Sequence, residues 1–179
     1  ALEADLNERG TPGRELVTRQ NLSGYHPGLL SGLVLAGANH PQAGGDDGYL
    51  TAEEVATLDL RGVELCVLSA CETGLGEVAG GEGLLGLQRA FQEAGSRAVV
   101  ASLWRVPDQA TRHLMERFYT NLWDRQSRMT KIDALREAQL WMLREGASRG
   151  LSIDDAPSTS DKRLPPYYWA AFVLSGDWH

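Results

Sequence analysis

Cysteine and basic residues are both scarce in this chain. Cys66 and Cys71 are the only cysteines among 179 residues, too few for the disulfide framework of a small secreted domain, so we expect a cytoplasmic protein. Lysine and arginine number 17 against 24 aspartates and glutamates, a formal net charge of −7. An acidic chain without a basic stripe is not expected to bind nucleic acid. No apolar run approaches the roughly 18 residues of a membrane helix, so no membrane partner is expected.

Spacings typical of metal and phosphate sites are missing from the sequence as well. It contains no Cys-x-x-Cys and no His-x3-His, so we expect no metal and no other cofactor. The P-loop pattern Gly-x4-Gly-Lys-Ser/Thr does not occur either. The glycines between Gly74 and Gly83 have a loose dinucleotide-type spacing, but the next predicted strand supplies no acid for a ribose. Nucleotide binding by this loop is therefore the weaker alternative.

What the chain does have is an alternation of strand-length apolar runs and helical patterns, which predicts an α/β fold. Residues 1–26 are interpreted as a loop or ragged N-terminal segment and residues 27–179 as the ordered domain. The first residue is Ala and not Met, which indicates a fragment or a processed piece. Strands are predicted at 33–36, 64–71, 97–104 and 168–174, and helices from Thr51, over 84–94, after Pro107-Asp108 and over 132–143. The apolar strands are typical of a largely parallel sheet covered on both faces.

Two of the predicted strands end in chemically capable residues. In open α/β sheets, functional groups gather at the carboxyl ends of the strands. Cys71 stands where a buried strand opens into a glycine-rich turn, where a thiol is exposed and backbone N–H groups can stabilise a thiolate and then an oxyanion. We interpret Cys71 as a candidate nucleophile and Cys66, in mid-strand, as a small core residue.

Six stretches of the sequence resemble the CHAT domain family in one consistent order. They are residues 31–37 (SGLVLAG), 50–54 (LTAEE), 68–76 (LSACETGLG), 81–87 (GEGLLGL), 101–108 (ASLWRVPD) and 169–177 (WAAFVLSGD). CHAT domains are caspase-like cysteine peptidase domains, mostly bacterial and commonly attached to tetratricopeptide repeats. The resemblance implies a caspase-like fold, a largely parallel sheet flanked by helices on both faces, with Cys71 as the nucleophile of a Cys–His dyad. Residues 27–179 would then be the C-terminal major part of such a domain.

The dyad needs a histidine, because a neutral thiol attacks poorly without a base or an imidazolium to favour the thiolate. In the family this histidine precedes a glycine at a strand end, and none of the four histidines here does so. We expect the catalytic histidine upstream of Ala1, with His26 and His40 as the alternatives within the chain. His113, within a predicted helix, and the last residue, His179, are interpreted as surface histidines.

The resemblance also implies where a peptide substrate binds. The predicted strand that ends Ser102-Leu103-Trp104 would run beside the substrate, which would pair with it as an additional strand. Trp104 could wall a side-chain pocket, and Ser69, Glu72 or Asp108 could line the pocket for the residue before the cut. An acid there would favour Arg or Lys, whereas Arg105 would favour an acidic residue. Asp108 could instead be the N-cap of the following helix, and Arg105 a solvated loop charge.

Together these features predict a caspase-like cysteine endopeptidase that hydrolyses protein substrates. We expect it to act in bacterial signalling or defence and to be regulated by an attached repeat or sensor domain. The missing His-Gly pair keeps a second class open, in which the same fold is a catalytically incomplete interaction module.

Overall fold

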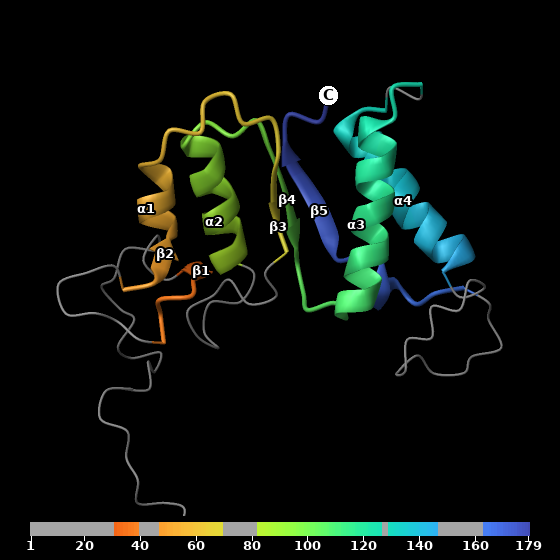
Figure 1. Ribbon diagram of the computed structural model, residues 1–179, viewed down its shortest axis with the longest axis horizontal. Helices are drawn as coiled ribbons and strands as arrows, with labels where there is room; N and C mark the ends of the chain where they lie inside the picture. The colour runs from red at the N-terminus through yellow and green to blue at the C-terminus, as the bar shows by residue number, and fades with distance from the viewer. Residues whose placement is uncertain (1–30, 40–46, 70–81, 127–128, 147–162) are drawn as a thin grey trace, which may run out of the picture.

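The computed structural model describes residues 31–39, 47–69, 82–126, 129–146 and 163–179. Strands and helices alternate in these ranges, as the sequence predicts (Figure 1). Their order is β1 (Gly32–Val34), β2 (Tyr49–Thr51), α1 (Ala52–Ala56), β3 (Cys66–Leu68), α2 (Glu82–Glu93), β4 (Ala98–Ser102), α3 (Asp108–Trp123), α4 (Lys131–Glu145), the 3₁₀ turn η2 (Pro166–Tyr168) and β5 (Phe172–Gly176). The fold is therefore a mixed α/β fold.

The main sheet has the strand order β3-β4-β5 in the part of the chain that is described. β3 runs parallel to β4, whereas β5 is antiparallel to β4. The sequence predicts a largely parallel sheet. The pair of β3 and β4 agrees with this prediction, whereas the antiparallel pair of β4 and β5 does not. The reason is the connection between β4 and β5. The chain runs away from the carboxyl edge of the sheet in α3 and back towards it in α4, so β5 starts at the edge where β4 ends (Figure 1). β1 and β2 form a separate antiparallel pair.

β4 is the central element of the core, and all five of its residues are buried. Its side chains alternate between two apolar clusters, as the period of two in a strand requires. Val100 packs with α3 and α4, while Val99 and Ala101 pack with α1 and α2. Helices consequently cover both faces of the sheet, α1 and α2 on one side and α3 and α4 on the other (Figure 1).

The helix starts follow local chemistry. The predicted capping box at Thr51 is confirmed: its hydroxyl accepts a hydrogen bond from Glu54 N–H, and the Glu54 carboxylate accepts one from Thr51 N–H. At α3 the N-cap is Pro107, and Asp108 is the first helical residue without a side-chain capping bond. The capping interpretation of Asp108 is therefore wrong. Its carboxylate lies instead in the first turn, where the helix dipole favours a negative charge.

The final strand begins later than its apolar sequence predicts. β5 starts at Phe172, because Pro165 and Pro166 favour a turn, and residues 166–168 form η2. In this turn Tyr168 N–H donates to the carbonyl of Pro165 and Ala170 N–H to that of Pro166. Among the helices described here, none is long and apolar enough to span a membrane.

Candidate functional site

Cys71, the predicted nucleophile, lies outside the described residues, as do Glu72, His26, His40 and most of the glycine-rich stretch from Gly74 to Gly83. β3, the strand that precedes Cys71 in the sequence, is described and ends at Leu68. The site is therefore described from the residues that form the carboxyl edge of the sheet.

β3 and β4 end side by side at that edge. Leu68 is paired with Ala101 in the parallel register, so Ser69 leaves the sheet beside Ser102, the last residue of β4. Ser69 is exposed, whereas Ser102 is buried, and its hydroxyl donates to the carbonyl of Trp104. This bond sets the bend of the chain as it leaves β4.

Trp104 is held in place at this edge by contacts on its ring. It is half-buried and packs against the cluster formed by α3 and α4. Its Nε1–H donates to the carbonyl oxygen of Tyr167 at 2.9 Å. Because β5 starts at the same edge, with Leu103 N–H donating to Ala171, the segment around Tyr167 lies next to the residues that follow β4.

Arg105 and Asp108 follow Trp104 in the sequence, and both are exposed. Neither side chain has a hydrogen-bonding or ionic partner among the residues that the structure places. Ser69 and Trp104 thus both follow strands that end at this edge, with Arg105 and Asp108 on the connection from β4 to α3. Sequence patterns do not single out Tyr167 or the Ser102 hydroxyl. Each takes part in a hydrogen bond to a backbone carbonyl, and only the fold or a turn brings the two partners together.

Neither of the two described histidines, His113 and His179, lies with a cysteine at this edge in the described part of the chain. His113 is on α3, with Nδ1 3.9 Å from the Glu116 carboxylate. His179 follows Asp177, whose N–H donates to the carbonyl of Arg97, and so lies at the amino end of β4. Cys66, the cysteine interpreted as a core residue, is in β3 and packs half-buried against the cluster on the side of α1 and α2.

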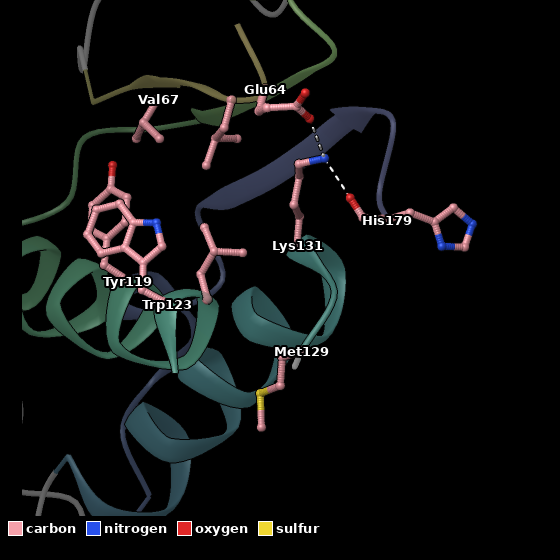
Figure 2. A pocket seen from close by; sticks show the side chains of 9 residues that line it. Glu64, Val67, Tyr119, Trp123, Met129, Lys131 and His179 are labelled. Atoms are coloured by element: carbon pink, nitrogen blue, oxygen red, sulfur yellow. Dashed lines mark hydrogen bonds and ion pairs between the residues drawn. The ribbon is translucent and has the colours of Figure 1, made fainter. Parts of the chain in front are cut away.

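A groove of about 740 Å³ opens on the other side of β3, on the face covered by α3 and α4 (Figure 2). Leu65, just before β3, and Val67 of β3 form one wall, and the stacked rings of Tyr119 and Trp123, 4.8 Å apart, form another. Burial raises the pKa of Tyr119 above its ordinary value of 10.0. Trp123 is 71% exposed. The groove is therefore an open, largely apolar surface beside a strand edge that no described strand covers.

The polar end of this groove is built around Lys131. Its side chain is only 9% exposed, and its ammonium donates to the carbonyl of His179 at 2.6 Å and lies 3.9 Å from Glu64 (Figure 2). Glu64 also pairs with Arg97 at 3.2 Å. None of the residues predicted from the sequence as site residues lines the groove. The groove is thus lined by other residues than Ser69, Trp104, Arg105 and Asp108.

Within the described ranges, no three side chains of His, Cys, Asp or Glu gather closely enough to hold a metal ion.

Comparison with known proteins connects this arrangement to a family. Tetratricopeptide repeat protein 28 of Mus musculus is 42% identical over 128 residues, which cover 71% of this chain and 4% of that protein. Tetratricopeptide repeat protein 28 of Homo sapiens is 38% identical over 73 residues, 41% of this chain and 3% of that protein. The chain thus corresponds to a small part of these relatives. Both are mammalian, so they give no support to the expected bacterial setting.

The family match itself covers most of the chain. The CHAT domain family matches residues 22–177, a range that contains all six stretches on which the resemblance rests, together with β3, β4 and β5. The chain belongs to the CHAT domain family, which is a caspase-like family.

Proposed function

We propose that this chain is the C-terminal major part, residues 27–179, of a caspase-like cysteine endopeptidase domain, with Cys71 as the nucleophile. The observation that carries the proposal is the CHAT family match over residues 22–177, in which β3, the strand that precedes Cys71 in the sequence, ends beside β4. A thiol at such an edge is accessible and has backbone N–H groups close at hand.

The proposed reaction is peptide-bond hydrolysis through a thioester. The Cys71 thiolate attacks the scissile carbonyl carbon, and the N–H of Cys71 stabilises the oxyanion that forms. The C–N bond then breaks, and a histidine gives its proton to the leaving amine. Water, activated by the same histidine, hydrolyses the thioester and regenerates the thiol. Every proton and electron pair is accounted for without a cofactor.

The histidine of this dyad is the open part of the proposal. His26 and His40 are the candidates within the chain, and a histidine from a longer polypeptide is the third. β3 lies at the edge of the described sheet, with no described strand beyond it, and this favours the third candidate. A parallel strand added there would end at the same edge as β3 and would bring its last residue next to the end of β3.

Two opposite substrate preferences follow from the exposed charges at the edge. Asp108, Ser69 or Glu72 in the pocket would select Arg or Lys before the cut, whereas Arg105 would select an acidic residue. Both Arg105 and Asp108 are exposed and without a partner among the placed residues, so both are available to a substrate. Trp104 is the proposed wall of a side-chain pocket.

We also propose that repeats attached to this domain regulate it in the cytoplasm as part of a signalling protein. Both relatives are named as tetratricopeptide repeat proteins and are far longer than this chain. Within a longer chain, a repeat array would provide the surface that senses a partner and passes the signal to the peptidase.

One observation favours a different class of function, a non-catalytic interaction module. Neither of the described histidines forms part of the carboxyl edge where β3 and β4 end, so the same fold could present this edge for binding alone. Nucleotide binding by the stretch between Gly74 and Gly83, of which only Glu82 and Gly83 are placed, is a weaker proposal. A thermal-shift screen with nucleotides would test it.

Labelling of the full-length protein decides between peptidase and module. A cysteine-directed peptide probe, such as an acyloxymethyl ketone, is expected to label the wild type and Cys66→Ala but not Cys71→Ala. His26→Ala and His40→Ala, labelled in parallel, identify the base if it lies in this chain. If the wild type stays unlabelled with its repeats both present and removed, the interaction-module function replaces the peptidase.

A further inference from the structure

The groove beside β3 contains a buried positive charge whose hydrogen-bonding capacity is only partly used. Lys131, the first residue of α4, lines the groove, and its side chain is 9% exposed. An ammonium has three N–H donors. One of them donates to the carbonyl of His179 at 2.6 Å, and this is its only hydrogen bond to a residue that the structure places (Figure 2). Because a buried donor without an acceptor costs free energy, the site favours a further acceptor.

Two carboxylates lie near Lys131, and neither is hydrogen-bonded to its ammonium. The Glu64 carboxylate is 3.9 Å from the ammonium nitrogen, whereas it lies 3.2 Å from the guanidinium of Arg97, and the Glu64 side chain is 59% exposed. Asp177 is exposed too, and its carboxylate accepts the N–H of His179 at 3.1 Å. Within the described part of the chain, Lys131 therefore has no carboxylate at hydrogen-bond distance.

The remainder of the groove is apolar and offers a flat face. The rings of Tyr119 and Trp123 stack with 16° between their planes, and Trp123 stays 71% exposed. Leu65 and Val67 form a second apolar wall (Figure 2). Flat apolar groups stack well on an exposed indole ring. The volume of about 740 Å³ is in the range of small-molecule sites, roughly 300–1,000 Å³.

We propose that this groove is a binding site for a small carboxylic acid with a flat apolar body. The carboxylate of the ligand accepts a hydrogen bond from the Lys131 ammonium, and the apolar body lies against the ring of Trp123. A hydrogen bond between two charged groups is about twice as strong as a neutral one, and covering the ring removes apolar surface from water. Neither residue is at the edge where β3 and β4 end, so this site is independent of the proposed peptidase.

Three probes separate the contribution of the charge from that of the apolar body. Naphthylacetate carries both parts, naphthylacetamide replaces the carboxylate by a neutral amide, and acetate lacks the apolar body. Isothermal titration calorimetry on the full-length protein at neutral pH is expected to show that naphthylacetate binds about tenfold more tightly than naphthylacetamide, as one charge-assisted hydrogen bond predicts. Acetate is expected to bind more weakly than either.

Substitutions place the binding in the groove. Lys131→Met keeps an apolar side chain of similar length but removes the charge, and is expected to lower the affinity for naphthylacetate to that for naphthylacetamide. Lys131→Arg keeps the charge and is expected to retain the preference for the acid. Trp123→Ala is expected to weaken both naphthyl probes by the same factor. Tyr167, 49% exposed and not part of the groove, provides the control: Tyr167→Ala is expected to change neither affinity.

The wild-type comparison requires no variant, so the proposal remains testable even if Lys131→Met does not fold. Glu64→Gln, at an exposed position, gives a second measurement: removing this negative charge is expected to tighten naphthylacetate and to leave naphthylacetamide unchanged. The proposal is overturned if no naphthyl probe binds at millimolar concentration or if the acid binds no more tightly than the amide. It is also overturned if folded Lys131→Met keeps the preference, or if Trp123→Ala leaves both affinities unchanged.

Discussion

At the scale of single residues, short-range hydrogen bonds decide where the chain changes direction. Thr51 and Glu54 satisfy each other's backbone N–H groups at the start of α1. Ser102 has a similar role at the end of β4, where its hydroxyl donates a hydrogen bond to the carbonyl of Trp104 and the chain bends. The first pattern is visible in the sequence because partners three residues apart form a known motif. The second is not, because a serine after a strand has many possible partners.

The capping box of α1 leads to a first prediction. Thr51→Ala removes the acceptor of Glu54 N–H and is expected to lower the free energy of unfolding by about 1 kcal/mol, measured by chemical denaturation. Thr120→Ala is the control, because the Thr120 hydroxyl is exposed and donates only to a carbonyl of its own helix. Equal losses in the two variants would show that the capping box does not stabilise the fold.

At the scale of elements, the two long helices α3 and α4 pack on the sheet through one stripe each. Leu114 and Phe118 of α3 are fully buried with Ala134, Ala138 and Met142 of α4. The opposite side of α3 carries Arg112 and Glu116, which pair four residues apart. The sequence predicts both helices from this periodicity. It does not predict that Trp123, at the end of α3, is left exposed beside β3.

Substitutions of two aromatic residues of α3 test this contrast between its buried and exposed side chains. Phe118→Ala leaves a cavity between α3 and α4 and is expected to lower the free energy of unfolding by about 3–5 kcal/mol. Trp123→Ala removes a larger side chain, but one that is 71% exposed, and is expected to lower it by less than about 1 kcal/mol. Chemical denaturation checks both values. A larger loss for Trp123 would mean that the groove beside β3 is covered in solution.

At the scale of the whole molecule, β4 connects the two halves of the core. Its alternate residues belong to the cluster of α1 and α2 and to that of α3 and α4. A strand shared by both clusters couples them, because loosening either side removes packing from the same backbone. We therefore expect the described part of the main sheet and its four helices to unfold together.

Truncations on the two sides of the sheet test this coupling. Leu87 of α2 and Leu114 of α3 are both fully buried, in different clusters. Leu87→Ala and Leu114→Ala are each expected to shift one common transition by about 2–5 kcal/mol, seen alike by far-UV circular dichroism and tryptophan fluorescence. Two separated transitions in either variant would show that the halves unfold independently.

The family and most elements of the fold could be predicted from the sequence, because they depend on local signals. Apolar periodicity located α2, α3, α4 and the buried core of β4, and six ordered motifs pointed to the CHAT family that matches residues 22–177. The predicted bounds differ from the observed ones mainly at strand ends. The prolines at 165 and 166 show why, since a turn there delays β5 to Phe172.

The candidate site was less accessible to sequence reasoning. Residue types near strand ends singled out Ser69 and Trp104, which the fold brings to one edge. Cys71, Glu72 and the histidine alternatives stay predictions. Tyr167 had no signal, because its role depends on a backbone carbonyl that accepts from Trp104, and a carbonyl is the same in every residue.

The sequence by itself determined the family, the alternation of strands and helices and the type of residue at each strand end, since these follow from side-chain chemistry and spacing. Only the tertiary structure decided the direction of β5, the place of β3 at the edge of the described sheet and the hydrogen bond from Trp104 to the carbonyl of Tyr167. These depend on which segments meet after two helices have returned the chain to the edge it left. Contacts of that kind are set by the packing of the whole core and not by the local sequence.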